Sequence, residues 1–194
     1  MRIITGIYKG RHFDIPRTFK ARPTTDVAKE NIFNVVRGYM DLEGADALDL
    51  FSGTGSISLE LVSRGCQSVI SVEADRDHFA FIKKCMEKIG TDRNILIKGD
   101  VFRFLKSCRT QFDFIFADPP YALEKLPEIP DIILNSDILK DGGIFVFEHG
   151  KHNDFSDNPH FLERRVYGSV NFSIFGKEAK ETVKETEERT LSVL

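Results

Sequence analysis

The stretch "LDLFSGTGSISLELVSRG", residues 48–65, decides the fold of this 194-residue chain. The apolar run that leads into it predicts a β-strand over residues 45–51. Gly53 and Gly55 then form a turn, and the apolar spacing after them predicts a helix over residues 56–64. A strand that passes through a glycine turn into a helix begins a strand–helix–strand unit.

The same alternation continues along the chain. Short β-branched or aromatic runs, bounded by Gly, Asp or Pro, alternate with segments at helical spacing. Such alternation implies right-handed crossovers and a parallel sheet with helices on both faces, so we predict a doubly wound α/β fold. The further strands are expected at residues 68–73, 94–98, 112–117 and 143–148, and the further helices at residues 75–88, 101–107 and around 130–135.

Two segments flank this alternation. Residues 1–40 predict a small basic β-hairpin that turns at Lys9 and Gly10, followed by a helix over residues 25–40. The runs on either side of Gly168 and Ser169 predict an antiparallel hairpin that adds two strands at the edge of the sheet, which makes seven. The apolar stripe of the N-terminal helix is expected to hold Ala28, Ile32, Val35 and Tyr39.

These patterns divide the chain into three parts. Residues 1–40 form an N-terminal extension, residues 41–176 form the main domain, and residues 177–194 form a highly charged tail. The tail lacks a clear apolar stripe, so we expect a frayed helix or a disordered segment there.

Charge is unevenly spread along the sequence. The net charge is −3, yet residues 1–37 hold eight basic and three acidic residues, a local charge of +5 that leaves −8 for the remainder. Such an asymmetry fits a face that attracts anions, and it equally fits an ordinary solvated surface. Charge alone therefore does not assign a nucleic-acid partner.

The composition bears on the compartment and on metals. No N-terminal apolar run resembles a signal peptide and no segment approaches the length of a membrane span, so we expect a cytoplasmic protein that does not contact membranes. Three cysteines without close pairing indicate neither a disulfide framework nor a cysteine zinc cluster. Glu148, His149 and His152 lie close together, but no further ligand cluster accompanies them, and we expect no metal.

The first two predicted strands end in residues that suit a nucleoside. Glu73 lies 20 positions after Gly53, about where a carboxylate meets ribose hydroxyls in nucleotide-binding units. The dinucleotide fingerprint requires a third glycine where this chain has Ser58, which disfavours NAD. Asp100, after the third strand, would either accept from an adenine amino group, with the backbone amide of Val101 beside it, or cap the following helix.

The fourth strand ends abruptly. In "FDFIFADPPYALEK", residues 112–125, an apolar run meets Asp118, Pro119, Pro120 and Tyr121. One interpretation is a strand-ending turn in which Asp118 bonds local amides and Tyr121 covers the sheet edge. The other is an active site, because ligands of open parallel sheets bind beyond the carboxyl ends of the strands.

The motifs together resemble a known family. "LDLFSGTGSISLELVSRG", "VEAD", "GDVFRFL" and "FADPPY", in this order, are similar to class I S-adenosylmethionine-dependent methyltransferases that act on amines. The N-terminal "RIITGIYKGRHFDIP" and "RPTTDVAKENIFN" narrow the resemblance to the RsmD-type family. It covers residues 1–175 and implies a seven-stranded Rossmann-like sheet. It also implies methylation of the exocyclic N2 amine of a guanine in bacterial 16S ribosomal RNA.

The resemblance implies a role for each part of the site. Asp118 and the carbonyl of Pro119 would accept the two amine hydrogens, Pro120 would help to keep them aimed, and Tyr121 would stack on the target base. The cofactor, S-adenosylmethionine, would contact Asp49, Phe51, Gly53, Gly55, Glu73, Ala74, Asp100 and Val101.

The basic extension would hold the RNA. Its candidate substrate residues are Arg2, Lys9, Arg11, Arg22 and Thr24. For Thr24 and its neighbour Thr25, helix capping is an equally good interpretation. The expected partner is ribosomal RNA or the assembling small ribosomal subunit, and the expected oligomeric state is a monomer.

Two alternatives stay open. A DNA adenine or cytosine amino-methyltransferase would use the same DPPY motif, although the chain is short for that role and shows no separate domain for reading the major groove. A binding protein that has kept the fold but lost turnover, such as an assembly factor that holds RNA, is the other. The presence of both Asp118 and Tyr121 disfavours this second alternative.

Overall fold

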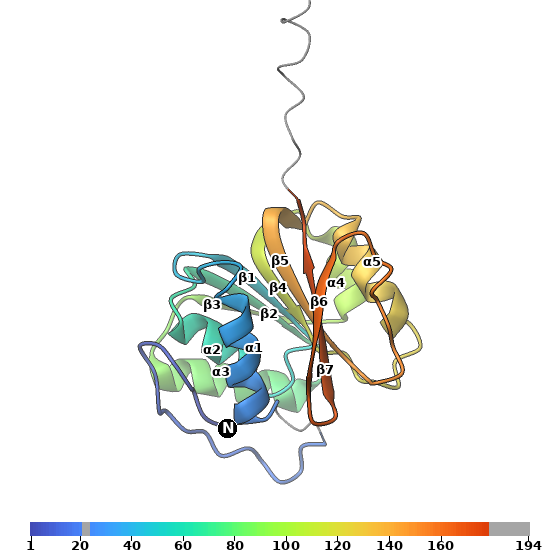
Figure 1. Cartoon of the computed structure of the whole chain (residues 1–194). Helices are drawn as coiled ribbons and strands as arrows, with labels where there is room; N and C mark the ends of the chain where they lie inside the picture. Colours follow the sequence, from blue (N-terminus) through green and yellow to red (C-terminus); the bar gives the residue numbers. More distant parts are fainter. Residues whose placement is uncertain (21–23, 179–194) are drawn as a thin grey trace, which may run out of the picture.

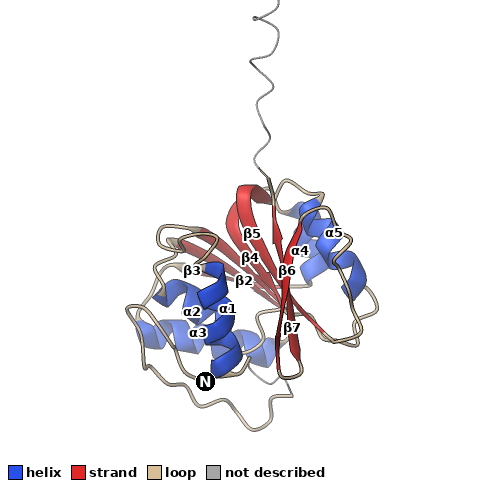
Figure 2. Cartoon of the chain, in the orientation of Figure 1, coloured by secondary structure: helices blue, strands red, loops and turns tan. Residues whose placement is uncertain are grey.

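The computed structural model describes residues 1–20 and 24–178. Arg22 and almost all of the predicted tail, residues 179–194, lie outside the described residues. A twisted sheet runs through the centre of the molecule with helices packed against both sides (Figures 1 and 2).

The sheet has seven strands in the order β3-β2-β1-β4-β5-β7-β6. The pairs β2–β3, β1–β2, β1–β4 and β4–β5 are parallel, and β7 pairs antiparallel with both β5 and β6. The predicted mostly parallel sheet with a C-terminal antiparallel hairpin is therefore confirmed. The strands are β1 (Asp46–Leu50), β2 (Ser68–Glu73), β3 (Asn94–Lys98), β4 (Phe112–Ala117), β5 (Leu139–His149), β6 (Phe161–Tyr167) and β7 (Val170–Gly176).

Helices divide between the two faces of the sheet. In Figure 1, α1, α2 and α3 lie on one side, and α4 and α5 lie on the other. Each face has its own apolar cluster because side chains alternate along a strand: Phe114 and Phe116 of β4 point to the first face, and Ile115 and Ala117 to the second. The helices are α1 (Asp26–Val36), α2 (Ser56–Ser63), α3 (Arg76–Ile89), α4 (Val101–Ser107) and α5 (Ile129–Leu134), with the short 3₁₀ turn η1 (Leu126–Glu128) before α5.

One strand is longer than predicted. The sequence placed the start of β5 at Gly143, whereas the strand begins at Leu139, which pairs with Phe112 across an irregularity in the register. Gly142 takes a positive φ of 79° inside the strand, so the glycine pair lets the strand bend without ending it.

The N-terminal hairpin is reduced to one bridge. Arg2 pairs antiparallel with His12, and the amide of Ile3 donates to the carbonyl of Arg11 at 3.0 Å. The turn begins earlier than predicted, at Gly6, whose φ is 94°. A Cβ at this glycine would lie 1.8 Å from the carbonyl oxygen of Ser63, so the loop is pressed against the end of α2.

The first helix is shorter than predicted. It ends at Val36, and Tyr39 lies beyond it with 43% of its surface exposed. The prediction that Tyr39 continues the apolar stripe is therefore wrong, because the chain turns away at Gly38 and the Tyr39 hydroxyl donates to Glu163. The buried residues of α1 are Ala28, Lys29, Ile32, Phe33 and Val36.

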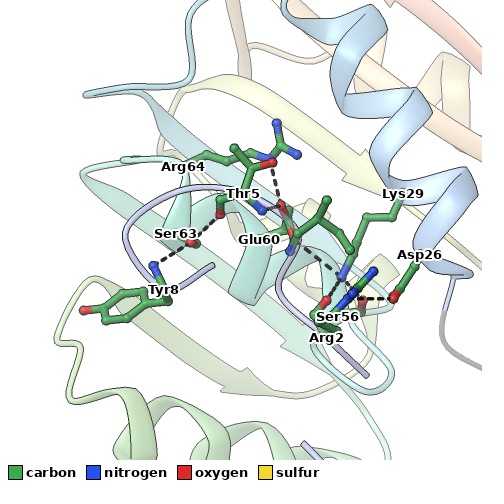
Figure 3. Close-up of polar contacts among 10 residues, drawn as sticks. Arg2, Thr5, Tyr8, Asp26, Lys29, Ser56, Glu60, Ser63 and Arg64 are labelled. Carbon is green, nitrogen blue, oxygen red and sulfur yellow. Dashed lines mark hydrogen bonds and ion pairs between the residues drawn. The ribbon is translucent and has the colours of Figure 1, made fainter. Parts of the chain in front are cut away.

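A buried charged cluster explains why Lys29 lies on that face. Glu60 of α2, which is fully buried, forms ion pairs with Lys29 at 3.4 Å and with Arg64 at 3.0 Å (Figure 3). Burial lowers the pKa of Lys29, and the charge of Glu60 opposes that change. The two carboxylate oxygens of Glu60 also accept from the backbone amides of Ile4 and Thr5, each at 2.9 Å.

The same cluster fastens the N-terminal segment to the main domain. The ammonium of Lys29 donates to the carbonyl of Arg2 at 2.6 Å and to the hydroxyl of Ser56 at 3.0 Å. The hydroxyl of Ser63 donates to the carbonyl of Thr5 and accepts from the amide of Tyr8 (Figure 3). Backbone groups that a short loop leaves unpaired are thus satisfied by α2.

Candidate active site

In open parallel sheets, ligands bind beyond the carboxyl ends of the strands. The ends of β1, β2 and β4 therefore form the candidate site. β1 lies at the centre, between β2 and β4, so the loops that follow these strands emerge side by side. The amide of Asp118, just after β4, donates to the carbonyl of Leu50 at the end of β1 at 3.3 Å. The DPPY segment and the glycine loop therefore meet at one edge of the sheet.

The glycine loop has an unusual backbone. Phe51 takes a positive φ of 59°, and it is the one non-glycine residue among the described ones to do so. Gly53 and Gly55 follow with φ of 57° and 76°. A Cβ at Gly55 would lie 2.9 Å from the side chain of Ile82, so this position requires glycine for space as well as for conformation. Strain of this kind is typical of functional sites.

The start of α2 is buried and lacks a side-chain cap. Its N-cap is Gly55, which provides no side-chain hydrogen bond to the first turn. The helix therefore presents backbone amides and the positive end of its dipole beside the glycine loop. A carboxylate or phosphate group fits such a place.

Glu73 connects the loops after β1 and β2. One carboxylate oxygen accepts from the amide of Gly53 at 2.6 Å, and the other accepts from the amide of Asp75 at 2.8 Å. The side chain is buried at the strand end where the sequence predicted a ribose contact, and Ala74 beside it is exposed.

Asp100 caps α4. Its carboxylate accepts from the amide of Arg103 at 2.9 Å, so the helix-capping interpretation of this residue is correct. The side chain is nevertheless exposed at the same edge of the sheet, after β3, and Val101 behind it is buried. Capping and contact with a ligand are compatible, because a carboxylate has more than one acceptor site.

Asp49 lies beneath the glycine loop. It is 1% exposed and accepts a hydrogen bond from the hydroxyl of Ser58 in α2. Burial raises its pKa to about 7, although the bond from Ser58 opposes that change. Ser58 also bonds the hydroxyl of Ser71 at 2.6 Å, so the serine that replaces the third glycine of the dinucleotide fingerprint links β1, β2 and α2.

The DPPY segment holds a carboxyl group that no cation of the described residues pairs with. Among the described residues, the side chain of Asp118 has no hydrogen-bond or ion-pair partner. Burial raises its pKa well above the ordinary value, and the negative charges of Glu148 and Asp49 raise it further. Pro119 is buried and Pro120 is exposed, so Asp118 leaves the sheet at a rigid corner.

Tyr121 lies across the end of β5. Its ring packs against Gly150, where a Cβ would lie 3.6 Å from a ring carbon, and its hydroxyl donates to Glu148 at 3.0 Å. Half of the residue's surface, 49%, is exposed. About half of Tyr121 therefore remains accessible, three positions after Asp118 in the chain.

Glu148 is the residue that sequence reasoning missed. The sequence pattern raises Glu148 only as a metal ligand, whereas in the structure it is 6% exposed and accepts from Tyr121 and, at a long 3.5 Å, from the hydroxyl of Thr24. Burial raises its pKa to about 7. The signal that could have found it is its place at the carboxyl end of β5, the strand next to β4.

The predicted RNA residues are spread over the N-terminal extension. Arg2, Lys9 and Arg11 are exposed; Arg2 pairs with Asp26 at 3.1 Å and Arg11 donates to the carbonyl of Lys88. Thr24 reaches the site itself through Glu148. Thr25, in contrast, caps α1 by accepting from the amide of Ala28, and Arg22 lies outside the described residues.

Membrane-spanning helices and groups of metal ligands are both absent from the described residues. No helix in that part of the chain is long and apolar enough to cross a membrane. Within the same residues, no three His, Cys, Asp or Glu side chains gather into a group that could hold a metal ion.

Comparison with known proteins places the chain among methyltransferases. The family model described as conserved hypothetical protein 95 matches residues 1–176. A relative in Bacillus subtilis, YlbH, is 32% identical over 184 residues, which cover 91% of this chain and 99% of the relative. The "Ribosomal RNA small subunit methyltransferase D" of Escherichia coli K12 is 26% identical over 183 residues, 93% of this chain and 91% of the relative.

A solved structure agrees with the fold. A hypothetical protein of Thermus thermophilus superposes with a TM-score of 0.80 at 27% identity. The match covers 91% of this chain and 99% of that protein.

Proposed function

The chain belongs to the family described as conserved hypothetical protein 95, the RsmD-type family, and on this premise we propose that it methylates ribosomal RNA of the small subunit. We infer further that the acceptor is the N2 amine of a guanine and that the methyl donor is S-adenosylmethionine. The observation that supports the proposal is the hydrogen bond from the amide of Asp118 to the carbonyl of Leu50, because it joins the DPPY segment, which would bind the amine, to the glycine loop, which would bind the nucleoside.

The residues around the glycine loop fit the cofactor. The uncapped start of α2 at Gly55 suits the carboxylate of its amino-acid part, and Glu73 suits the ribose hydroxyls. Asp100 and the amide of Val101 suit the adenine. Asp49 supports the loop from below, and Phe51 and Ala74 flank it. The cofactor supplies an electrophilic methyl group on its sulfonium.

The DPPY segment prepares the amine. An exocyclic base amine is a poor nucleophile because its lone pair is delocalised into the ring. Asp118 and the carbonyl of Pro119 accept its two hydrogens and turn the lone pair toward the methyl group. The prolines hold these acceptors in place, and Asp118 stabilises the positive charge that develops on the nitrogen. The proton leaves the nitrogen after the new N–C bond forms.

The target base must leave its own stack to reach this site. The exposed part of the Tyr121 ring offers a surface on which a flipped base stacks. Residues 1–40 form the RNA-facing extension in this proposal, with Arg2, Lys9, Arg11 and Arg22 at the phosphates and Thr24 nearer the base. Ribosomal RNA, free or in an assembling small subunit, is the partner.

The proposal is tested by the identity of the methylated nucleoside. Labelled S-adenosylmethionine is offered to unmodified small subunits, free ribosomal RNA, duplex DNA and total protein, and the product is identified by mass spectrometry. Asp118→Ala is the inactive variant, and Asp137→Asn, at an exposed position, is the matched control. We expect N2-methylguanosine from RNA or subunits with the wild type and the control only.

The other outcomes decide between the alternatives. Methylated adenine or cytosine in DNA would keep the mechanism but overturn the substrate. Transfer to no acceptor, together with tight RNA binding that survives Asp118→Ala, would favour the binding protein without turnover.

A further inference from the structure

We propose that Glu148 selects guanine over the other bases by accepting the hydrogen on ring nitrogen N1 while Asp118 and Pro119 hold the N2 amine. This inference rests on the proposed function and assigns to Glu148 a part of the site that the DPPY motif does not supply.

The register of the sheet places Glu148 beside Asp118. Ala117, the last residue of β4, pairs with Phe147 of β5, so the residues that follow them, Asp118 just after β4 and Glu148 within β5, are neighbours. The negative charge of Glu148 raises the pKa of Asp118, which reports the same proximity. Two carboxyl groups therefore face one place at the mouth of the site.

Within the described residues, the buried Glu148 and the half-buried Asp118 lack a compensating positive charge. Among the described residues neither Glu148 nor Asp118 forms an ion pair. From the part of the chain that the structure describes, Glu148 accepts hydrogen bonds from the hydroxyls of Tyr121, at 3.0 Å, and of Thr24, at 3.5 Å. Two adjacent carboxyls without a cation cost stability, and a ligand that brings several hydrogen-bond donors would compensate for that cost.

The contacts of Glu148 also fix its position. Tyr121 comes from the DPPY segment and Thr24 from the N-terminal extension, so Glu148 is held between the residue that stacks on the base and the segment that faces the RNA. Its side chain is 6% exposed, and the rest of its surface is enclosed by protein. A group held in this way can discriminate between ligands, since it cannot move aside for the wrong one.

Guanine has the matching pattern of donors. Its N1–H and its N2 amine are adjacent, so two neighbouring acceptors fit that edge. Adenine and cytosine carry their amines next to a ring nitrogen without hydrogen, which is an acceptor. Placing that acceptor against a carboxylate leaves two buried acceptors facing each other, and a site that binds through hydrogen bonds rejects such a mismatch strongly.

The protonation state agrees with this role. Burial raises the pKa of Glu148 to about 7, so the side chain is partly protonated near neutral pH. A donor bound to the carboxylate favours the ionised form, and guanine N1–H is such a donor. The acceptor form is therefore the one that guanine binding selects.

The test compares bases that differ at N1. Substrate RNA is made with guanine, 2-aminopurine or 2,6-diaminopurine at the position that the wild type methylates. Both analogues keep the amine at C2 but have a bare N1, and they differ from each other at C6. We expect the wild type to prefer guanine over either analogue by about 100-fold or more in kcat/KM.

Glu148→Gln should narrow that preference. The glutamine keeps an oxygen for the Tyr121 hydroxyl but offers an amide N–H to the bare N1 of the analogues. We expect guanine methylation to fall about 10-fold to 100-fold and the preference for guanine to shrink at least about tenfold. Glu163→Gln is the matched control, because Glu163 accepts from the hydroxyl of Tyr39 at 2.7 Å outside the site. It should leave the preference unchanged.

Each result decides the matter. A preference that stays unchanged in Glu148→Gln, with guanine still methylated, would overturn the role of Glu148 and leave the proposed function standing. If that variant does not fold, the wild type alone suffices, because equal rates on guanine and on both analogues exclude reading of N1. A wild type that methylates no guanine would fail the proposed function itself, and this inference with it.

Discussion

Two buried polar clusters lie in this molecule, and they are built in opposite ways. Around Glu60, a carboxylate meets two cations and two backbone amides, and the charges compensate each other (Figure 3). At the ends of β4 and β5, Asp118 and Glu148 follow paired residues and are neighbours, and among the described residues neither pairs with a cation. The first cluster fastens the N-terminal segment to the domain. In the proposed function, the second holds acceptors for a ligand.

Whether a buried charge is compensated by neighbouring groups distinguishes a structural cluster from a functional one. A compensated cluster should matter to stability and little to chemistry, because its groups are already satisfied. A cluster without compensating charges should contribute to catalysis and should lower the free energy of unfolding. Four predictions test this difference, in order of the size of the expected effect.

The largest effect is expected at Asp118. Asp118→Asn removes the charge that stabilises the methylated nitrogen, so methyl transfer should fall by about 1000-fold. The midpoint of thermal unfolding should stay or rise, because repulsion from Glu148 is relieved. Single-turnover methylation and thermal melting measure the two quantities. A clear fall in the melting midpoint would place Asp118 with the structural cluster.

Glu60→Gln should show the reverse behaviour. The change leaves Lys29 and Arg64 buried without a counter-ion, so the free energy of unfolding should fall by about 3 kcal/mol. Methylation per folded molecule, measured at low temperature, should stay within about twofold of the wild type. Urea unfolding checks the stability, with Glu87→Gln at an exposed position as control. An unchanged unfolding midpoint would contradict the structural role.

The raised pKa of Asp49 predicts that the free energy of unfolding depends on pH. Its folded-state pKa is raised from 3.8 to about 7, so the folded protein holds this proton more tightly than the unfolded chain. The resulting stabilisation is complete below about pH 4 and is lost as the pH rises through 7. From pH 5 to pH 8, the free energy of unfolding should fall by about 2 kcal/mol more in the wild type than in Asp49→Asn.

Urea unfolding at both pH values measures this difference. Asp137→Asn, whose side chain is exposed, serves as control and should keep the pH dependence of the wild type. Parallel curves for the wild type and Asp49→Asn would show that Asp49 is ionised in the folded protein throughout this range.

The smallest effect is expected at the Tyr121 hydroxyl. Tyr121→Phe removes its bond to Glu148 but keeps the ring for stacking, so kcat/KM should fall by only about fivefold, near 1 kcal/mol. Tyr121→Ala, which removes the ring as well, should lose considerably more. Steady-state kinetics on the RNA substrate measures both. Equal losses in the two variants would mean that the hydroxyl, not the ring, carries the function of Tyr121.

Much of the fold was predictable because its signals are local. The strands β2, β3 and β4 begin and end at the predicted residues, since Gly, Asp and Pro mark their ends. The prediction failed where a tertiary contact overrides the local pattern. Gly143 does not start β5, because Leu139 gains a partner in Phe112, and α1 does not reach Tyr39, whose hydroxyl binds Glu163.

The residues of the candidate site also divide into those that the sequence predicts and those that only the tertiary structure identifies. Asp118, Gly53 and Glu73 were found because each stands at a strand end in a recognisable motif. Glu148 was not, since nothing in its own neighbourhood distinguishes it from a glutamate that ends a strand. The sequence also gave no reason to expect Lys29 in the core of the protein, because a lysine is normally exposed unless an acidic residue is buried with it.

By itself, then, the sequence determined the alternation of strands and helices, the glycine loop and the DPPY corner, because these features depend on residues that are close together in the sequence. Only the tertiary structure decided which charges meet. Glu148 lies 27 residues from Tyr121 and 124 from Thr24, yet the order of the strands and the docking of the N-terminal segment place all three together. Electrostatic energy depends on distance in space, and the fold alone sets that distance.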